Sequence, residues 1–549
     1  MTINVDKIFI KSWRPFLWIA FVGILLYSKT LFFDLTFLDD NVWIQDYGWY
    51  LKNAGHIKEV FVRPDLISKV FYRPMVSLSF IIDAHLYGGS LIGYHFSNVL
   101  FHLIGAMLVF ALFCRLGYER ITSFLFALVF CVHPVLTSAV AWIPGRTDSL
   151  LGGFVLSSFL FFLGYLKKRR ALVLIGHLFF LVCALLTKET AIILPILCVL
   201  YFFLFPSDKK DLKKGIALFV CWIVVMSVWG WGLIISSESK IPFLIMVQTM
   251  VKNAPSIVNY LGKACFPFRL SVLPVLRDLT FIEGFITIIV ITIGLYFSRQ
   301  RRWPVITFGL AWFVLFLAPA LIVSFLKHEY RLYLPLVGFL VILLEMARGR
   351  GGNLKGLHIF VVAVVGLFTV LTWGHSRHYK DRFAFWENAV ATSKHSPLAH
   401  RNLGAMYQLE GKIDLAKEAY QKPLSLNPHE AMVHNNLGII AVGEKDFQKA
   451  EEEYLEEIRI NPEYDNAHYN LGVLYYMQGK YHQAEAMWKK TVKLNPNYID
   501  AYNKLLVHYL TQKNFRRADE YRKILLQKGA SVPERIERFL MKNAANHEG

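Results

Sequence analysis

The sequence lacks the motifs that identify several large classes of enzyme. It has no GxxxxGK(S/T) loop, which leaves a P-loop motor unsupported. It also has no HExxH and no GxSxG, so a zinc peptidase or an elbow-type serine hydrolase is unsupported. Any chemistry must therefore come from other polar residues.

Three further absences concern the cell compartment. The six cysteines form no CxxC pair, and we interpret them as small apolar fillers. No N-x-(S/T) sequon occurs, which favours a bacterial inner membrane over the endoplasmic reticulum. No cleavable signal peptide is evident. Instead Trp13–Phe33, with Lys7, Lys11 and Arg14 at its start, is long enough to stay in the membrane as a signal anchor.

What the sequence has in abundance is apolar residues and positive charge. Of its 549 residues, 55% are hydrophobic and 15% aromatic, the net charge is +19, and the mean hydropathy is +0.41. From Ser376 onward lie 25 of the 59 basic and 22 of the 40 acidic residues, so the earlier part carries 34 against 18. That excess falls in short loops between apolar stretches, which indicates a membrane protein and excludes a nucleic-acid-binding face.

A helix needs roughly 20 apolar residues to cross a bilayer. Eleven stretches qualify, and we expect the ambiguous Ile241–Leu261 to be interfacial or re-entrant. The predicted spans are Trp13–Phe33, Tyr94–Phe113, Thr122–Val140, Leu150–Leu166, Ala171–Leu186, Ala191–Phe205, Ile216–Ile235, Phe281–Phe297, Pro304–Phe325, Leu332–Met346 and Leu357–Trp373.

The basic clusters orient these spans, because loops rich in Lys and Arg stay in the cytoplasm. With a cytoplasmic N-terminus, all five clusters fall inside, and the C-terminal part falls outside. The clusters are Arg115–Arg120, Lys167–Arg170, Lys209–Lys214, Arg299–Arg302 and Arg348–Lys355. The loops that hold the unusual polar residues then all face outward.

The C-terminal part repeats with a period of 34 residues. Asn-Pro recurs at 427, 461 and 495, and Asn-Leu-Gly recurs at 402, 436 and 470. This period, with its small and aromatic positions, is typical of tetratricopeptide repeats, in which Asn-Pro ends the second helix of each unit. A fourth unit is degenerate, with Leu506 in place of Gly, as suits a capping repeat.

The predicted architecture is all-α: a polytopic membrane domain of about eleven spans followed by an α-solenoid of tetratricopeptide repeats. We place the membrane domain at 1–375, a connector at 376–398, the repeats at 399–530 and a tail at 531–549.

An acidic pair, Asp39 and Asp40, follows the first predicted span on the outer side. Charge near a membrane is costly and often marks function. Two adjacent acids can raise each other's pKa, which favours a general-base role for at least one of them. The alternative is that either carboxylate caps a following helix. The pair could also hold a divalent metal, but nothing in the sequence requires a metal or another cofactor.

Other outer loops supply cations and polar groups. Arginine can fork a phosphate, and Lys327 and His328 can add charge. The expected phosphate- or substrate-binding residues are Arg73, His133, Arg146, Asp148, Lys188, Glu189, His328, Arg331 and Tyr333. The alternatives are a plain salt bridge for Arg73, pairing of Arg146 with Asp148, and a snorkelling Arg331. Lys188 and Glu189 are adjacent, so their side chains should diverge to different partners.

His95, Asn98 and His102 recur at spacings of three and four. On a helix they form one polar stripe along a membrane span. Hydrogen bonding between helices is the favoured interpretation. Metal binding is less favoured, because nothing supplies a matched third ligand.

Taken in order along the chain, these motifs resemble one family. They are Phe37-Leu38-Asp39-Asp40, Tyr72-Arg73-Pro74, the stretch His95–His102, His133-Pro134 with Ala141-Trp142 and Gly145–Asp148, Lys188-Glu189, Arg331–Pro335, and the repeats. The chain is similar to the transmembrane and tetratricopeptide-repeat proteins, within the GT-C class of glycosyltransferases that includes the protein O-mannosyltransferases. The resemblance implies a lipid-phosphate sugar donor, a hydroxyl acceptor and a catalytic acid in the first outer loop, with Asp39 ahead of Asp40. Ser138 departs from the family pattern, which often has an acid there.

The sequence therefore predicts a membrane glycosyltransferase that moves a sugar, with mannose the leading guess, from a polyprenyl-phosphate donor to a protein hydroxyl on the periplasmic or luminal side. The repeats would recruit the acceptor. One alternative is a non-enzymatic membrane scaffold for envelope complexes. Another is a transferase or ligase that acts on a glycan or lipid.

Overall fold

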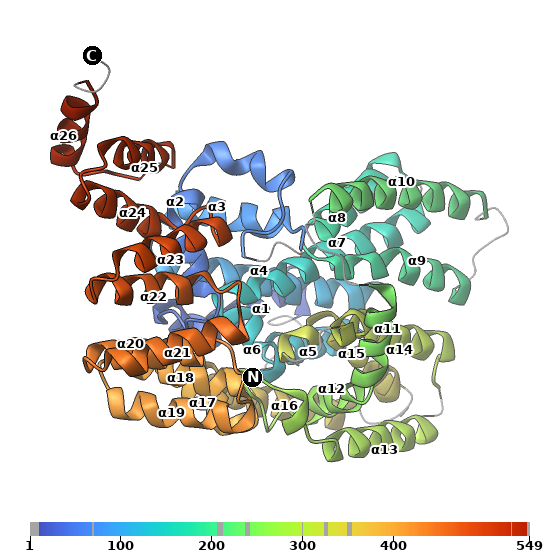
Figure 1. Ribbon diagram of the computed structural model, residues 1–549. Coiled ribbons are helices and arrows are strands. Elements are labelled where there is room, and N and C mark those ends of the chain that lie inside the picture. Colours follow the sequence, from blue (N-terminus) through green and yellow to red (C-terminus); the bar gives the residue numbers. More distant parts are fainter. Residues whose placement is uncertain are drawn as a thin grey trace. The chain divides into compact units, whose positions relative to one another are not determined.

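The computed structural model describes residues 10–67, 71–168, 170–205, 212–236, 242–298, 300–322, 328–348, 354–528 and 530–545. Within these ranges the chain folds into helices without a β-sheet, which confirms the all-α prediction. The chain divides into two compact units, Met1–Lys394 and His395–Gly549 (Figure 1). Parts of the predicted basic clusters at 167–170, 209–214, 299–302 and 348–355 lie outside the described residues, as does Lys327.

The first unit contains apolar helices at all eleven predicted spans. Seven are long and apolar enough to cross a membrane, and an eighth arises if α5 and the following helices, bent by 50°, count as one span. The seven are α1 (Arg14–Tyr27) with η2 (Ser28–Phe32), α4 (Leu91–Arg115), α7 (Arg146–Lys168), α10 (Leu212–Ser236), α14 (Trp303–Leu317) with η11 (Ala318–Ile322), α15 (Tyr333–Arg348) and α16 (Leu354–Ser376). The bent pair is α5 (Arg120–Cys131) with η6 (Pro134–Leu136) and α6 (Thr137–Ala141).

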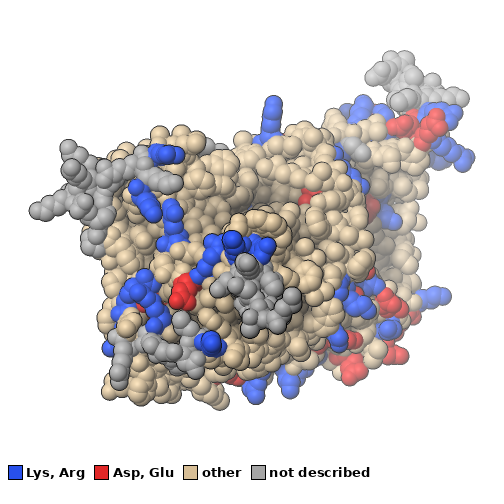
Figure 2. All heavy atoms as spheres, turned by 180° about the vertical axis from the view of Figure 1, so that it is seen from behind, with Lys and Arg blue, Asp and Glu red and all other residues tan. Residues whose placement is uncertain are grey.

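Three predicted spans are shorter helices, α8 (Ala171–Leu185), α9 (Ile193–Leu204) and α13 (Ile282–Phe297). The ambiguous segment forms two short helices, α11 (Phe243–Asn253) and α12 (Ser256–Cys265). Much of the face drawn in Figure 2 carries neither basic nor acidic residues. The unit is that of an integral membrane protein.

Long helices separate two polar ends of this unit. At 1.5 Å per residue, α4 and α7 are each about 35 Å long, roughly the thickness of a bilayer core. At one end the backbone and guanidinium of Arg302 donate to the buried Glu345 carboxylate, which also accepts from Tyr118. The Arg302 guanidinium reaches the Leu116 carbonyl as well. The loops predicted to be cytoplasmic are thus fastened together at the end opposite to the acidic pair.

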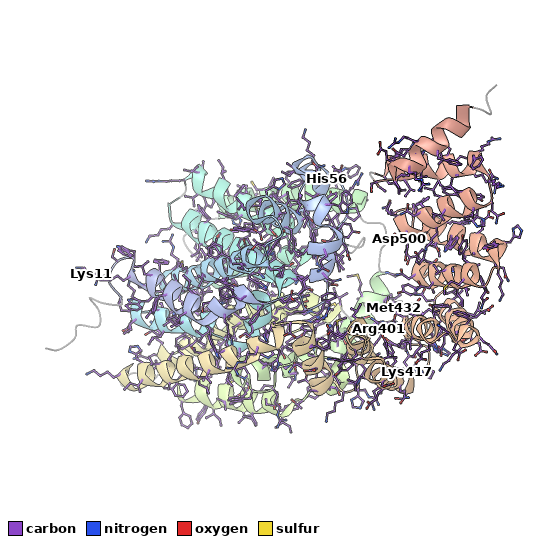
Figure 3. All side chains as sticks on the ribbon, turned by 90° about the vertical axis from the view of Figure 1, so that its left-hand side faces the viewer. Lys11, His56, Arg401, Lys417, Met432 and Asp500 are labelled. Carbon is purple, nitrogen blue, oxygen red and sulfur yellow. The ribbon has the colours of Figure 1, made fainter. Side chains whose placement is uncertain are left out.

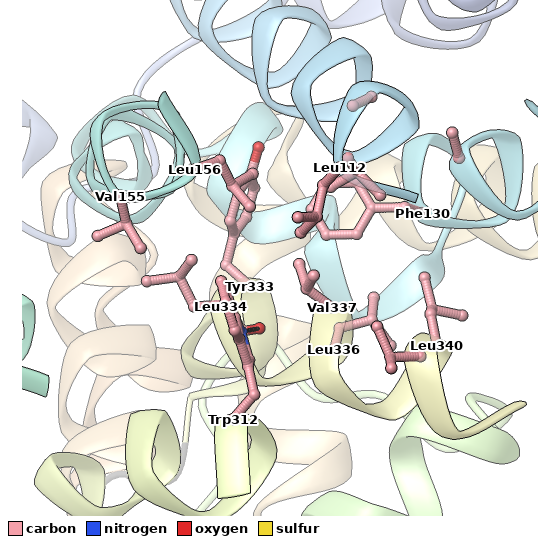
Figure 4. Packing of buried hydrophobic residues seen from close by; sticks show 14 of the residues in the cluster. Leu112, Phe130, Val155, Leu156, Trp312, Tyr333, Leu334, Leu336, Val337 and Leu340 are labelled. Carbon is pink, nitrogen blue, oxygen red and sulfur yellow. Dashed lines mark hydrogen bonds between the residues drawn. The ribbon is translucent and has the colours of Figure 1, made fainter. Parts of the chain in front are cut away.

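The core of the unit forms around α4, α7, α14 and α15. Figure 4 shows Tyr333, Leu334 and Val337 of α15 packed against Trp312 of α14 and against residues of α7 and α4. Gly309 and Gly338 lie where α14 and α15 cross, and a Cβ on either would come within 3 Å of the other's carbonyl oxygen. Small residues at this crossing let the two backbones approach closely, as membrane helices require.

The outer end of the unit has a smaller core of its own. After η2 the chain forms short helical segments, η3 (Val42–Asp46), α2 (Gly48–Leu51), η4 (Ala54–Ile57) and η5 (Glu59–Phe61), before α3 (Pro74–Tyr87). Trp43 stacks on Phe80 of α3 with ring centroids 4.4 Å apart. This apolar cluster also includes Tyr94 and Ile143. It fixes the first outer loop to α3, α4 and the turn before α7.

The second unit is a series of helix pairs. They are α18 (Pro397–Leu409) with α19 (Ile413–Leu426), α20 (Val433–Gly443) with α21 (Phe447–Ile460), α22 (Asp465–Met477) with α23 (Tyr481–Leu494), and α24 (Ile499–Thr511) with α25 (Phe515–Gln527). The second helix of each of the first three pairs ends directly before Asn-Pro, as predicted. Figure 3 labels Arg401 and Lys417 in the first pair and Met432, whose left-handed backbone (φ 72°) precedes α20.

The repeated glycines explain how the paired helices approach. Gly404, Gly438 and Gly472 each face the aromatic residue sixteen positions later, and a Cβ there would lie 2.6 Å from Tyr420, Tyr454 or Trp488. In the fourth pair the corresponding residues are Leu506 and Arg522. Because no aromatic ring occupies that place, Leu506 fits and is buried.

The segments predicted as connector and tail both contain helices. The expected connector, 376–398, contains η13 (Arg377–Tyr379) and α17 (Arg382–Thr392), and all but its last four residues belong to the first unit. The expected tail contains α26 (Glu534–Ala545), on which Phe539 contacts Phe515 of α25.

Gly438→Ala should destabilise the second unit by about 1–3 kcal/mol, because the new methyl overlaps the Tyr454 ring. Faster hydrogen exchange across α20 and α21 of the full-length protein in detergent would report the loss. Gly443→Ala in the same helix is the matched control, since nothing lies within 4 Å of its added Cβ. The control should keep or improve protection, and equal loss in both variants would contradict the packing argument.

Candidate active site

The two adjacent acids at the outer end differ in their surroundings. Asp40 is 1% exposed, and its carboxylate accepts hydrogen bonds from the backbone N–H (2.7 Å) and hydroxyl (2.8 Å) of Thr36 and from the N–H of Asn41 (2.9 Å). Burial raises the pKa of Asp40 to about 6, although these hydrogen bonds oppose the rise. Asp40 therefore holds the turn to the preceding Thr36. It does not cap the helical turn that follows, because η3 has no side-chain cap.

Asp39 lies in a backbone conformation that few residues adopt. Its φ is 67°, and Phe37 two residues earlier has φ 60°. Left-handed backbone at residues other than glycine costs about 1–3 kcal/mol and persists only where the surroundings impose it. The Asp39 carbonyl accepts from the N–H of Trp43, at the start of the π-helical turn η3. The turn thus directs the two neighbouring carboxylates to different places.

Asp39 lines a cavity of about 170 Å³ at the outer end of the first unit. The charged residues in its wall are Asp39, Asp65, Arg73, Asp148 and Lys188. The remaining lining is largely apolar and aromatic, and it includes Trp43, Phe71, Trp142 and Tyr330. Loops that are far apart in sequence therefore place carboxylates and cations around one space.

Two ion pairs form part of the wall. The Arg73 guanidinium donates to both oxygens of Glu189, at 3.3 and 2.9 Å. The Lys188 ammonium contacts both oxygens of Asp148, at 2.8 and 2.9 Å. The prediction that Lys188 and Glu189 serve different partners is confirmed. The alternative that Arg146 pairs with Asp148 is wrong, because Asp148 pairs with Lys188.

The enclosure of the cavity changes the acidity of its groups. The Asp39 side chain is solvent-accessible, but the walls displace much of the surrounding water, and this burial, together with the Asp65 charge, raises its pKa. Burial lowers the pKa of Lys188 against the attraction of Asp148, and the charges of Arg73 and Arg331 lower it further. An acid that gains a proton readily and cations held close together suit proton transfer beside an anion.

An aromatic group closes one side. The His328 ring stacks on Tyr330 (4.8 Å) and Trp142 (6.2 Å), and the Lys188 ammonium lies 5.6 Å from the Tyr330 ring centre. Burial and the charges of Arg331 and Lys188 lower the pKa of His328 well below its usual value. This shift favours the neutral imidazole over the positive charge expected of His328. Arg331 donates to the Ala320 carbonyl.

Arg146 belongs to the fold rather than to the cavity wall. Its side chain is fully buried and donates to Asp83 (2.5 Å), to the Asn98 amide oxygen (2.9 Å) and to the Tyr94 carbonyl (2.8 Å). Its guanidinium also lies 4.2 Å from the Phe80 ring centre. With these contacts made, Arg146 has no face to offer a phosphate, contrary to expectation.

The predicted polar stripe lies buried on α4. Asn98 donates to the carbonyls of Val140, Trp142 and Ile143. His102 contacts the Tyr333 hydroxyl and the Cys131 carbonyl. Bonding between helices, the favoured interpretation, is confirmed for these two residues, and His95 is buried beside them.

Two other expected binding residues are structural. Tyr333 is 1% exposed and lies against Gly105 and Gly152 in the core. His133 is buried and contacts the Ala264 carbonyl. Their motifs predict that both residues lie in the site. Their burial, which results from tertiary packing, makes them part of the fold instead.

The sequence alone did not predict most of the wall, including Trp142, Tyr330 and Asp65. Trp142 and Tyr330 stand inside or next to quoted motifs, so their position was a usable signal. Asp65 lies in a loop with no motif, and nothing in the sequence pointed to it. Among the residues that the structure describes, no group of three or more His, Cys, Asp or Glu side chains could hold a metal ion.

Asp83→Asn should destabilise the protein by about 3–5 kcal/mol, because it leaves the buried Arg146 charge without a counter-ion. Thermal aggregation of the detergent-solubilised protein would measure it. Glu59→Gln is the control, since its pair with Arg63 is exposed and worth about 0–1 kcal/mol. Similar losses in the two variants would contradict the role of the buried pair.

Comparison with known proteins agrees with the repeats and with the membrane part. Models of the tetratricopeptide repeat match residues 400–430 and 466–498, and one described as TPR repeat matches 444–479. Solved structures titled for Pseudomonas aeruginosa pilF (22% identity, TM-score 0.27, covering 35% of this chain and 83% of that one) and MamA (24%, 0.24, 26% and 88%) are also similar.

Curated relatives carry one kind of name. "Protein O-mannosyl-transferase F38B6.6" of Caenorhabditis elegans is 23% identical over 65% of this chain and 54% of its own length. "Protein O-mannosyl-transferase TMTC1" of Mus musculus is 35% identical over 27% of this chain and 17% of its own length. The chain thus spans about half of the first relative and under a fifth of the second. The chain carries tetratricopeptide repeats, as the sequence analysis predicted. It is similar to the transmembrane and tetratricopeptide-repeat protein O-mannosyl-transferases.

Proposed function

We propose that this protein is a membrane O-mannosyltransferase, of GT-C type, that uses a polyprenyl-phosphate mannose donor and a protein hydroxyl as acceptor. The observation that carries the proposal is the cavity in which Asp39 lies with Arg73 and Lys188. The names of the curated relatives support the choice of mannose and of a protein acceptor. The repeats would bind the acceptor polypeptide, as such arrays do.

In this reaction Asp39 accepts the proton of the acceptor hydroxyl as its oxygen attacks the anomeric carbon. The bond between that carbon and the phosphate oxygen breaks, and the polyprenyl phosphate leaves as an anion. Arg73 and Lys188 line the same cavity and would stabilise the charge that develops on the leaving group. Arg331, close enough to Lys188 to affect its acidity, would add to this field.

The ion pairs of the cavity wall are compatible with such a role. Arg73 keeps guanidinium N–H groups beyond the two that reach Glu189, and an ammonium has three donors. Glu189 and Asp148 therefore fix both cations in place without using all their donors. A phosphate could approach cations that are already oriented, so little side-chain entropy would be lost on binding.

Asp39→Asn should lower the rate of mannose transfer by about 10²–10⁴-fold, the usual contribution of a general base. The assay uses purified protein in liposomes with labelled polyprenyl-phosphate mannose and membrane proteins as acceptor. Asparagine is the suitable replacement because it tolerates a left-handed backbone. Asp40→Asn is the contrast: it should lower thermal stability together with activity, because it disturbs three hydrogen bonds.

Full activity in Asp39→Asn would rule out its role as base. Transfer to lipid instead of protein would rule out the proposed acceptor. Failure of wild type to transfer from any polyprenyl-phosphate sugar would overturn the enzymatic proposal.

Transfer should fall with decreasing pH at a higher pH than an ordinary aspartate would give, because Asp39 must be ionised and its pKa is raised. Asp65→Asn removes a neighbouring negative charge, so the pKa of Asp39 should fall and the acid limb should move to lower pH. The pH–rate profile of kcat measures both effects. Glu59→Gln, outside the cavity wall, is the control, and an unmoved acid limb in Asp65→Asn would contradict the electrostatic argument.

A further inference from the structure

The left-handed turn that carries Asp39 needs an external restraint. Phe37 and Asp39 both have positive φ, and neither is glycine. Asp40 binds the turn to Thr36 and Asn41 within the same segment. The apolar cluster of Trp43 and Phe80 fixes the loop beyond the turn, and a contact at the turn itself can fix Asp39 relative to the opposite wall of the cavity.

Trp142 supplies such a contact. Its indole N–H donates to the Leu38 carbonyl at 2.9 Å, across 104 positions of sequence. Leu38 lies between the two left-handed residues, so the hydrogen bond acts at the centre of the turn. The Trp142 ring is itself part of the cavity wall, and it is 7% exposed. The same side chain thus touches the turn and the space that the turn faces.

Trp142 is in turn held by a rigid frame. The Asn98 amide N–H groups donate to the Trp142 carbonyl at 3.0 Å and to the carbonyls of Val140 and Ile143. The Asn98 amide oxygen accepts from the buried Arg146. The N–H of Gly145 closes the turn onto the Trp142 carbonyl at 3.0 Å. A Cβ at Gly145 would lie 2.1 Å from the Ser138 carbonyl oxygen, which shows how tightly this turn packs. The frame gives the indole one fixed position.

We propose that Trp142 is a positioning residue for Asp39: its indole N–H, fixed by Asn98 and Arg146, holds the Leu38 carbonyl and so places the Asp39 carboxylate at the cavity wall. This inference rests on the proposed function for its kinetic consequence, but the placement itself can be tested without turnover. In this proposal Asn98 and Arg146 act on Asp39 only indirectly, because they hold the turn that carries Trp142.

The acidity of Asp39 offers a readout of its place. Moved toward open water, its carboxyl would lose the burial that raises its pKa. The charged and titratable groups that face it across the cavity are Asp65, Arg73, Asp148, Lys188 and Tyr330. Since these groups belong to other residues, a change in the Asp39 titration on substitution of Trp142 reports a change in the surroundings that Trp142 gives to Asp39.

The test is Trp142→Phe, which keeps an aromatic ring and removes the N–H. Asp39 in the full-length protein is labelled with a carbodiimide and glycine ethyl ester at a series of pH values, and the extent is read by mass spectrometry. We expect the labelling midpoint to move to lower pH in the variant. In the transfer assay kcat should fall about tenfold or more, since small misplacements of a catalytic group are costly, while donor KM changes little.

Trp312→Phe is the matched control. The Trp312 indole also donates to a backbone carbonyl, that of Leu334 at 2.8 Å, and is also buried, but it lies in the core away from the cavity. It should leave the labelling midpoint unchanged, and size-exclusion profiles should show that both variants fold.

An unchanged midpoint in Trp142→Phe, or the same shift in Trp312→Phe, would overturn the positioning role. If wild type transfers no sugar but the midpoint shifts only in Trp142→Phe, the placement stands and the proposed function fails. If wild type transfers and Trp142→Phe matches it in both kcat and midpoint, the function stands and the positioning role fails.

Discussion

A single buried cation organises the outer end of the membrane unit. The Arg146 guanidinium cannot remain unpaired in a medium of low dielectric constant, so the chain must bring it a carboxylate and further acceptors. Asp83 of α3, Asn98 of α4 and the Tyr94 carbonyl meet that requirement. Three helices that are separate in sequence are thereby fixed at one point. The turn that carries Trp142, and through it the Asp39 segment, is built on that point.

The cavity applies the same electrostatic rule at its surface. Arg73 and Lys188 are each paired with a carboxylate, which fixes their positions, whereas Asp39 stands at the wall with another acid nearby. Burial lowers the pKa of Lys188 although Asp148 opposes it, and burial raises the pKa of Asp39 with the help of the Asp65 charge. His328 stacks on Trp142 and on Tyr330, and its lowered pKa favours the neutral ring. Such a division between fixed cations and one proton acceptor is what transfer from a phosphate leaving group requires.

The repeat unit depends on a simpler constraint, which is steric. Each glycine at 404, 438 and 472 makes room for the aromatic ring of the paired helix. The fourth pair replaces both members, with Leu506 opposite Arg522, and closes its own core with α26 beyond it. In this pair the glycine and the aromatic residue are both absent. The larger Leu506 therefore meets no ring, and the degenerate repeat still packs.

The sequence by itself determined the helical class, the apolar segments and the repeats, because each is encoded in local spacing: runs of about 20 apolar residues, a 34-residue period, and Asn-Pro after each second helix. It also indicated that the polar loops share one side, since Lys and Arg mark the other. It could not decide which polar groups meet. That Asp40 braces the turn while Asp39 faces the cavity, that Arg146 takes Asp83 and leaves Asp148 to Lys188, that Tyr333 is core, and that Asp65 joins the wall were decided by tertiary structure. Apart from the local bonds of Asp40, such choices depend on contacts between residues tens to hundreds of positions apart. They also depend on burial, which local spacing does not record.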